Sequence, residues 1–451
     1  MPRNAKLLCA LMSVPLGCGE AGEDAVAETP TSLDPLAMPS TPTLGLDQFN
    51  SADTCAGCHP NHYAQWQLSR HARAMRDPVY RALVELRQAE IGGDQDPFCT
   101  QCHSTLCTRS GECGSDLAFE ALSPISLEGV TCEACHKVRA VVRSFNAGHE
   151  LDPDGPMRGP IVEPVDAGVH AVEYSPLFDD ASLCGSCHDV MSMSGMMLEQ
   201  PYAEWLASPA NPGQPCQRCH MPTYAGKAAV TGPERDDLHL HRFVGVDLPL
   251  EGDVDPATLA ELDAEIDALL ATAVAVRLEL PGSVRAGGQL EFSVAVESRI
   301  AGHGFPTGST FNRQAWIELA VRDAADRLLY ASGQLDARGD LRDRWSSLAP
   351  AADLDLIRFG SHFTDADGEP VLSSWRAHEH ELAVLPAMAS RTFTRSLHVP
   401  ADAVGPVRVE AVMHFRAYPP HLLRRLGLDE LVAQVPVRDI AADAGAVELR
   451  D

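Results

Sequence analysis

The sequence has 451 residues, 45% of them hydrophobic, and a formal net charge of −28 at pH 7. A chain of this length and composition is expected to fold into two or three soluble domains. Its negative charge argues against nucleic acid and anionic lipid headgroups as partners and favours basic partners instead.

Residues 1–18 have the pattern of an export signal. A positively charged start precedes an apolar run, residues 7–17, that is too short to span a bilayer as a mature helix. Gly17 followed by Cys18 resembles a bacterial lipoprotein processing site, which would leave Cys18 lipidated; plain signal-peptidase cleavage is the alternative. We therefore expect an exported protein in the periplasm, or an outer-membrane or cell-surface lipoprotein, of a Gram-negative-type bacterium.

Residues 19–50 are rich in proline, threonine and acidic residues and show no sustained periodicity. This composition predicts a flexible tether between the export signal and the first folded domain.

The spacing of the cysteines carries the strongest signal, because the pattern Cys-x-x-Cys-His occurs five times. Two intervening residues place both thiols on one helical turn, where they can form thioethers with the two vinyl groups of a haem, and the histidine can bind the iron. Zinc knuckles, redox-active cysteine pairs and structural disulfides are alternatives for one copy, but none of them requires an immediate histidine five times. We therefore predict five haem c groups within residues 51–245. The predicted thioether cysteines are Cys55, Cys58, Cys99, Cys102, Cys132, Cys135, Cys184, Cys187, Cys216 and Cys219, and the predicted proximal ligands are His59, His103, His136, His188 and His220.

Two further cysteines, Cys107 and Cys113, lie in a short glycine-containing stretch after the second motif. They are predicted to form a disulfide, with two buried free thiols as the alternative. No cysteine follows Cys219, so the remainder of the chain is built without thiol chemistry and a domain boundary is expected near residue 245.

The distal ligand of each iron decides the function, because two strong axial ligands give an electron-transfer centre whereas an open position binds substrate. His71 follows the first motif on a helical-looking stretch, about three turns from His59, so it is expected to ligate a haem other than its own. One of the alternating pair His239 and His241 is expected to ligate, with the other beside it or exposed. Further candidates in loops are His149 and His170. For each of them a solvent-exposed or hydrogen-bonded histidine is the alternative.

Several stretches carry a family resemblance: residues 53–60 with Trp66, Ser69-Arg-His71-Ala, residues 128–136 and residues 216–222. They resemble the cytochrome c-554 type of multihaem cytochrome, which is related to the haem core of hydroxylamine oxidoreductase and pentahaem nitrite reductase. The resemblance covers about residues 50–245. It implies a mostly helical fold around closely stacked haems that relay electrons between partners, with His71 as a distal ligand. The chain departs from that type in having five motifs where the type has four.

The region after the motifs changes character. Residues 255–270, within a connecting segment 246–272, are predicted as a helix with Pro256 near its start and apolar residues three or four apart. Residues 273–451 hold alternating or β-branched runs, at 275–280, 290–296, 315–321, 390–394 and 407–413. These predict an antiparallel β-sandwich of about six to eight strands. The expected fold class is therefore α + β multidomain, a mostly α or irregular cytochrome domain followed by an all-β sandwich.

Within the β-rich region, Ala301-Gly-His-Gly-Phe-Pro-Thr-Gly308 is a glycine- and proline-shaped loop that displays His303. It resembles a loop of multihaem cytochromes that end in such a domain, which makes His303 another candidate distal ligand, reaching across the domain interface. A tight turn with a solvated histidine is the alternative.

The predicted function is electron transfer through five covalently bound haems, with other cytochromes or a membrane electron-transfer complex as partners and a lipid as the membrane anchor. No catalytic residue is assigned. The alternative is a haem oxidoreductase that acts on a small nitrogen or sulfur compound at one haem with an open axial site. Six candidate distal histidines are available for five irons, which permits two axial ligands at every iron but does not prove it.

Overall fold

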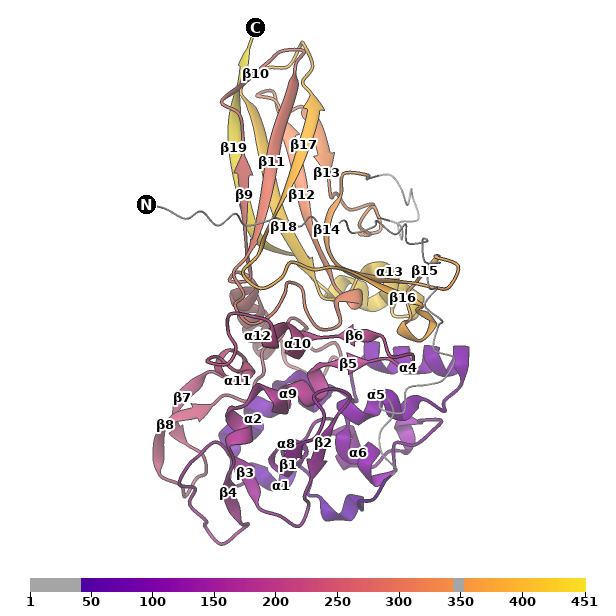
Figure 1. The fold of residues 1–451 in the computed structure, drawn as a ribbon, viewed down its shortest axis with the longest axis vertical. Coiled ribbons are helices and arrows are strands. Elements are labelled where there is room, and N and C mark those ends of the chain that lie inside the picture. Colours follow the sequence, from indigo (N-terminus) through magenta and orange to yellow (C-terminus); the bar gives the residue numbers. More distant parts are fainter. Residues whose placement is uncertain (1–41, 344–352) are drawn as a thin grey trace, which may run out of the picture.

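The computed structural model describes residues 42–343 and 353–451. The predicted export signal, Cys18 and most of the predicted tether lie outside these residues. Figure 1 shows a mainly helical part below and a β-rich part above, which confirms the predicted fold class. No helix in the two described ranges is long and apolar enough to cross a membrane.

Short helices and two-stranded sheets make up the helical part. The small sheets pair β1 with β2, β3 with β4, β5 with β6 and β7 with β8. The helices are α1 (Asp53–Ala56), α2 (Pro60–Leu68), α3 (Arg70–Arg73), α4 (Pro78–Ile91), α5 (Asp96–His103), α6 (Thr105–Ser110), α7 (Pro124–Leu127), α8 (Cys132–His136), α9 (Ala181–His188), α10 (Pro201–Leu206) and α11 (Cys216–His220), and the strands are β1 (Val138–Val141), β2 (His149–Leu151), β3 (Met157–Gly159), β4 (Val172–Tyr174), β5 (Val190–Met191), β6 (Met197–Glu199), β7 (Thr223–Lys227) and β8 (Glu234–His239).

The Cys-x-x-Cys-His motifs coincide with helix ends. Helices α5, α8, α9 and α11 each end at the motif histidine, and the first motif runs from α1 to His59, the residue that precedes α2. A helical turn brings residues three apart onto one face, so each pair of motif cysteines is held side by side. The local structure that the spacing predicts is therefore present at each motif.

The helical stretch expected to carry His71 is interrupted. Helix α2 ends at Leu68, and Ser69 starts the separate helix α3, where its hydroxyl accepts a hydrogen bond from the Ala72 amide at 3.3 Å. A serine at this position satisfies one of the free amides of a helix start. The chain therefore does not run as one continuous helix from His59 to His71, and the position of His71 follows from how α3 packs.

The β-rich part contains an eight-stranded and a three-stranded sheet, more strands than the six to eight expected. Several additional strands are short, and β19 (Arg438–Arg450) alternates small and polar residues, so these lack the apolar alternation that marks a strand in sequence. In contrast, β14 (Ile357–Thr364) has that alternation at Ile357, Phe359 and Phe363 and was overlooked. One pairing, β10 with β19, is parallel, whereas the others are antiparallel. The strands are β9 (Val274–Glu279), β10 (Ser283–Arg285), β11 (Gln289–Ser298), β12 (Gln314–Arg322), β13 (Leu328–Ser332), β14 (Ile357–Thr364), β15 (Pro370–Val371), β16 (Glu379–Ala383), β17 (Ser390–His398), β18 (Val407–Arg416) and β19 (Arg438–Arg450), and the helices are α12 (Pro256–Leu270) and α13 (Pro420–Arg425).

The apolar core is distributed unevenly between the two parts. One large cluster joins both β-sheets with Ile266 and Leu270 of α12, the helix expected between the domains. Apolar side chains of the helical part form only small separate clusters, such as Ala52, Trp66 and Ala72. Burial of apolar surface is the main stabilising term in folding. The helical part therefore has little apolar side-chain core of its own, as expected where prosthetic groups occupy the interior.

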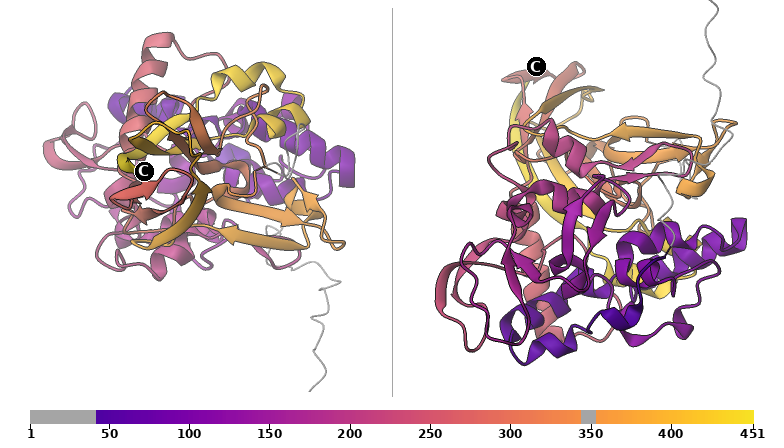
Figure 2. Two further views of the ribbon diagram at one scale, coloured as in Figure 1. Left: turned by 90° about the horizontal axis from the view of Figure 1, so that it is seen from above. Right: turned by 60° about the horizontal axis from the view of Figure 1, so that its bottom comes forward.

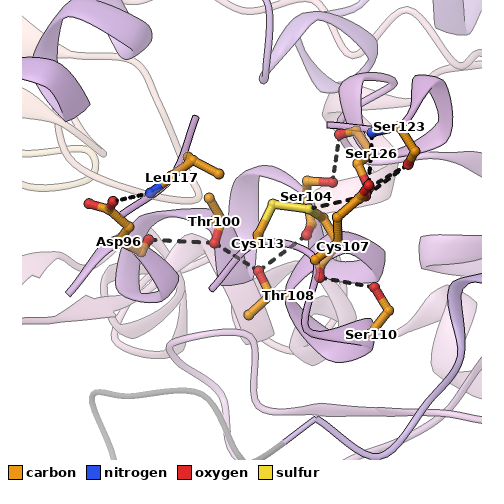
Figure 3. The surroundings of a disulfide bond; sticks show 11 residues. Asp96, Thr100, Ser104, Cys107, Thr108, Ser110, Cys113, Leu117, Ser123 and Ser126 are labelled. Atoms are coloured by element: carbon orange, nitrogen blue, oxygen red, sulfur yellow. Dashed lines mark hydrogen bonds between the residues drawn. A yellow bond between two sulfur atoms is a disulfide. The ribbon is translucent and has the colours of Figure 1, made fainter. Parts of the chain in front are cut away.

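A disulfide joins Cys107 and Cys113, the pair that the sequence nominated (Figure 3). Both residues are buried and pack with Tyr80 and Leu117 in one apolar cluster. The disulfide closes the turn between α6 and the segment that leads to Leu117, so it holds the chain just after the second motif.

We expect the Cys107→Ala/Cys113→Ala double variant to lose about 2–3 kcal/mol of unfolding free energy, because the short closed loop no longer restricts the unfolded chain. Chemical denaturation of the holoprotein would measure the loss. Unchanged stability would show that the surrounding packing alone holds this turn.

The two parts meet at Glu90, near the end of α4. Its carboxylate accepts hydrogen bonds from the Trp375 indole at 2.9 Å and from the guanidinium groups of Arg376 at 2.8 Å and Arg425 at 3.0 Å. These donors come from the β15–β16 connection and from α13. Figures 1 and 2 show these segments of the β-rich part resting against the helical part. A single carboxylate therefore ties α4 to two segments that are distant in sequence.

This contact predicts a pH dependence. Burial opposes the ionisation of Glu90, but hydrogen bonds from Trp375 and Arg376 outweigh it and lower its pKa. Because the pKa is lower in the folded state, the contact contributes stability above about pH 4.3, the ordinary glutamate value, and loses it as the pH falls further. We expect the thermal midpoint of the wild type to fall more than that of Glu90→Gln between about pH 5 and pH 3. An equal fall of the thermal midpoint in the wild type and in Glu90→Gln over this pH range would contradict the prediction.

Candidate haem sites

Four motif histidines each face a second histidine across a nearly constant gap. An imidazole nitrogen binds a transition metal at about 2.0–2.1 Å, so two imidazoles on opposite sides of one iron have ring centres about 6 Å apart. The observed spacings fit this arrangement, which is the evidence that these residues suit a haem iron. The distances between ring centres are 6.2 Å for His59 and His170, 6.0 Å for His188 and His71, 6.3 Å for His136 and His241, and 6.2 Å for His220 and His303.

Backbone carbonyl groups orient several of these rings. The Nδ1 atoms of His59 and His136 lie 2.7 and 2.5 Å from carbonyl oxygens, and those of His241 and His303 lie 2.9 and 2.8 Å from such oxygens. A carbonyl can only accept, so Nδ1 carries the proton and the Nε2 lone pair is directed into the gap. The rings are therefore prepared to bind a metal through Nε2.

Burial lowers the pKa of His71, His136, His220 and His241 and so favours the neutral imidazole, which is the state that binds a metal. The pKa of His71 is lowered to about 4, first by burial and then by the neighbouring His188. The pKa of His241 is lowered to about 3, first by burial and then by His62, whose ring lies edge-on at 4.7 Å. His62 also lies near the motif residue His59, three positions before it in the chain, with ring centres 6.4 Å apart and planes 44° apart.

The second motif differs from the other four. Among the described residues no second imidazole faces His103; instead the Tyr80 ring stacks on it, with centres 4.0 Å apart and planes 7° apart. Tyr80 comes from α4, whose start is capped by Asp77. Burial raises the pKa of Tyr80 well above its ordinary value, so its hydroxyl stays protonated. Sequence reasoning missed Tyr80 because nothing in its local pattern separates it from an ordinary apolar helix residue.

His149 and His239, both nominated as distal ligands, lie outside the four pairs. His149 is buried, with Nδ1 at 3.1 Å from the Ser186 hydroxyl, and His239 has Nδ1 at 2.6 Å from the Met221 carbonyl. Of the alternating pair His239 and His241, only His241 is opposite a motif imidazole, because the chain has left β8 by that residue and turns inward.

The motif cysteines show how the five motifs follow each other in space. Thiols of different motifs are in hydrogen-bond contact: the first with the third, the second with the fourth, and the fourth with the fifth. The third motif also lies near the fourth, because burial and then the neighbouring Cys187 raise the pKa of Cys135. The order in space is therefore first, third, fourth and fifth, with the second motif beside the fourth.

Comparisons with known proteins agree with this site. Residues 54–137, which include the first three motifs, match the family of cytochrome c554 and c-prime. The fold is similar to that of a penta-heme cytochrome c552 from Thermochromatium tepidum, with a TM-score of 0.62 and 19% identity over 90% of this chain and all of that one. No match was found among curated protein sequences.

A weaker likeness, restricted to part of the chain, is to the CARDB domain of a Pyrococcus furiosus protein, with a TM-score of 0.18 and 10% identity over 39% of this chain and 87% of that one. The five motifs, the family match over residues 54–137 and the shared fold support a multihaem c-type cytochrome.

Proposed function

We propose that the chain binds five haem c groups and relays electrons through them between partner proteins. Haem c supplies a one-electron iron centre at each motif. The observation that carries the proposal is the set of four facing imidazole pairs, since an iron with two histidine ligands transfers electrons and has no vacant position for substrate.

The residues take distinct roles in this proposal. Each motif contributes two thioether cysteines and a proximal histidine. His170, His241, His71 and His303 are the distal ligands at the first, third, fourth and fifth motifs. The sequence of contacts between motifs supports a path from the first through the third and fourth to the fifth. The fourth motif contacts three others, so every route between the second motif and the rest crosses it.

The number and ligation of the haems can be tested on the purified holoprotein. We expect the pyridine haemochrome assay and the intact mass to give five haems per chain. The electron paramagnetic resonance spectrum of the oxidised protein should contain low-spin signals from four haems with two histidine ligands. Fewer than five haems, or a mainly high-spin spectrum, would refute the proposal.

The second motif supports a further candidate function, reaction of a small nitrogen or sulfur compound at one iron. The specific observation is that no imidazole faces His103 within residues 42–343 and 353–451. An open distal position lets a small molecule reach the iron. In this reading Tyr80, neutral and stacked on His103, would fix the orientation of the proximal ring.

This second candidate has its own test. A high-spin ferric signal from one haem, which changes when nitrite or hydroxylamine is added, would support it. A spectrum that is wholly low spin and insensitive to both compounds would leave only the relay. The two outcomes are separable because the other four haems provide an internal low-spin reference.

We also propose that the chain acts outside the cytoplasm, anchored through Cys18, with basic redox proteins as partners. The disulfide between Cys107 and Cys113 supports an oxidising compartment, and the net charge of −28 favours a basic partner surface. Fractionation of cells that express wild type or Cys18→Ala would test the anchor, since the variant should move from the membrane to the soluble periplasmic fraction. Electron transfer to a basic monohaem cytochrome should slow as salt increases.

A further inference from the structure

His303 reaches the fifth motif from the β-rich part of the molecule. It lies in the loop between β11 and β12, and its ring faces His220 of α11, with ring centres 6.2 Å apart and planes 20° apart. A ligand supplied by a loop of the other part needs that loop to be held in place, because a displacement of about 1 Å is enough to disturb a metal site.

One carboxylate of the helical part holds this loop. Glu204 of α10 accepts a hydrogen bond from the Gly304 amide at 3.0 Å and another from the Thr307 hydroxyl at 2.5 Å. Both bonds end on the same oxygen, Oε2. Gly304 directly follows His303, and its amide is buried, so without Glu204 that donor would have no partner and would carry the cost of an unsatisfied buried group.

The surroundings leave the loop little room to shift. Phe305 exchanges two backbone hydrogen bonds with Leu385, each 2.8 Å long. A Cβ atom at Gly304 would lie 3.2 Å from the Leu385 carbonyl oxygen and 3.5 Å from Oε1 of Glu204. The loop is therefore held by Leu385 and Glu204, with the half-buried His303 next to the fifth motif.

We propose that Glu204 is the positioning residue for His303, and that its two hydrogen bonds keep the imidazole seated as the distal ligand of the fifth haem. This inference rests on the proposed function, which assigns His303 to that haem. Glu204 acts through the loop backbone and binds no iron itself. Releasing the loop would let His303 leave and would open the fifth haem to small ligands.

Because both hydrogen bonds end on one oxygen, variants of Glu204 and Thr307 are expected to release His303 to different extents. Glu204→Gln keeps one carbonyl oxygen that can accept both hydrogen bonds, whereas Glu204→Ala keeps none. Thr307→Val removes one donor at nearly constant size. We therefore expect release of His303 to increase in the order wild type, Glu204→Gln, Thr307→Val, Glu204→Ala. In Glu204→Ala the released fraction should be roughly tenfold or more above that of the wild type.

The experiment uses the full holoprotein and carbon monoxide as the probe. Carbon monoxide binding to the reduced protein and the high-spin ferric signal would be measured for each Glu204 and Thr307 variant. His303→Ala is the positive reference, because it removes the ligand directly. Glu90→Ala is the matched control, since Glu90 is another carboxylate that ties the two parts together, at a site away from His303.

The expected result is that Glu204→Ala resembles His303→Ala, with one additional carbon monoxide site, while Glu204→Gln and Glu90→Ala resemble the wild type. If His303→Ala opens a haem but Glu204→Ala and Thr307→Val do not, the role of Glu204 is refuted and the ligand assignment stands. If His303→Ala itself opens none, the assignment of the fifth haem fails. If Glu90→Ala also opens that haem, contact between the two parts in general seats His303, and the specific role of Glu204 is refuted.

Discussion

In the His71→Ala variant we expect one ferric haem to change from low spin to high spin and its reduction potential to rise by on the order of 100 mV, since axial ligands tune haem potentials over about 0.8 V. His71 is the group opposite His188 of the fourth motif, at 6.0 Å between ring centres. The fourth motif contacts the second, third and fifth. Electron passage through the whole chain should therefore slow by roughly tenfold or more, a barrier increase of about 1.4 kcal/mol.

Spectroelectrochemical titration would measure the potential, and electron paramagnetic resonance the spin state. His239→Ala is the matched control, because His239 was also a candidate distal ligand by sequence but lies outside the four pairs. We expect its spectrum to equal that of the wild type. Low-spin signals that persist unchanged in His71→Ala would show that another residue ligates the fourth haem.

In the Asp96→Ala variant we expect a loss of about 3–5 kcal/mol of unfolding free energy, which is the usual cost of breaking a buried ion pair from one side. Asp96 forms this ion pair with Arg87, and both side chains are almost fully shielded from water. Asp96 also accepts hydrogen bonds from the Gln88 side chain at 2.6 Å and the Leu117 amide at 2.7 Å. Removing it leaves the Arg87 charge buried without its partner.

The same variant should lower haem attachment at the second motif. Asp96 is the first residue of α5, and that helix ends at His103. Denaturation midpoints and the haem-to-protein ratio would measure the two effects. Arg139→Ala, which breaks an exposed pair with Glu150, is expected to cost less than about 1 kcal/mol and to leave the haem content unchanged. Equal losses in the two variants would contradict the importance of burial.

Much of the local structure could be predicted from the sequence because it depends on short-range spacing. The helix of the connecting segment is present as α12, and the five apolar runs named in the β-rich region lie in β9, β11, β12, β17 and β18. Several short strands escaped prediction because their few residues carry no alternation, and β14 was overlooked although Ile357, Phe359 and Phe363 alternate. The break at Ser69 also escaped, because serine is compatible both with a helix interior and with a helix start.

The partners of the motif histidines depended on tertiary structure. His71 and His149 were both candidate distal ligands, yet the packing of α3 brings only His71 opposite a motif imidazole, while His149 turns towards Ser186. Neither Tyr80 nor Glu204 could be picked out from the sequence. An aromatic residue in an amphipathic helix is usually a core residue, and a single glutamate is usually a solvated surface residue. The roles of Tyr80 and Glu204 become visible only through the neighbours that the fold brings to them.

The predicted positions of haem attachment follow from short-range spacing, because two thiols and a histidine within five residues meet on one helical turn whatever the rest of the chain does. The sequence by itself also determined the division into a cysteine-rich helical part and a cysteine-free β-rich part. The tertiary fold was needed to show which histidine lies opposite which motif, and that the second motif has no facing imidazole among the described residues. The physical reason is that a distal ligand is a long-range contact, made by residues that local spacing does not connect.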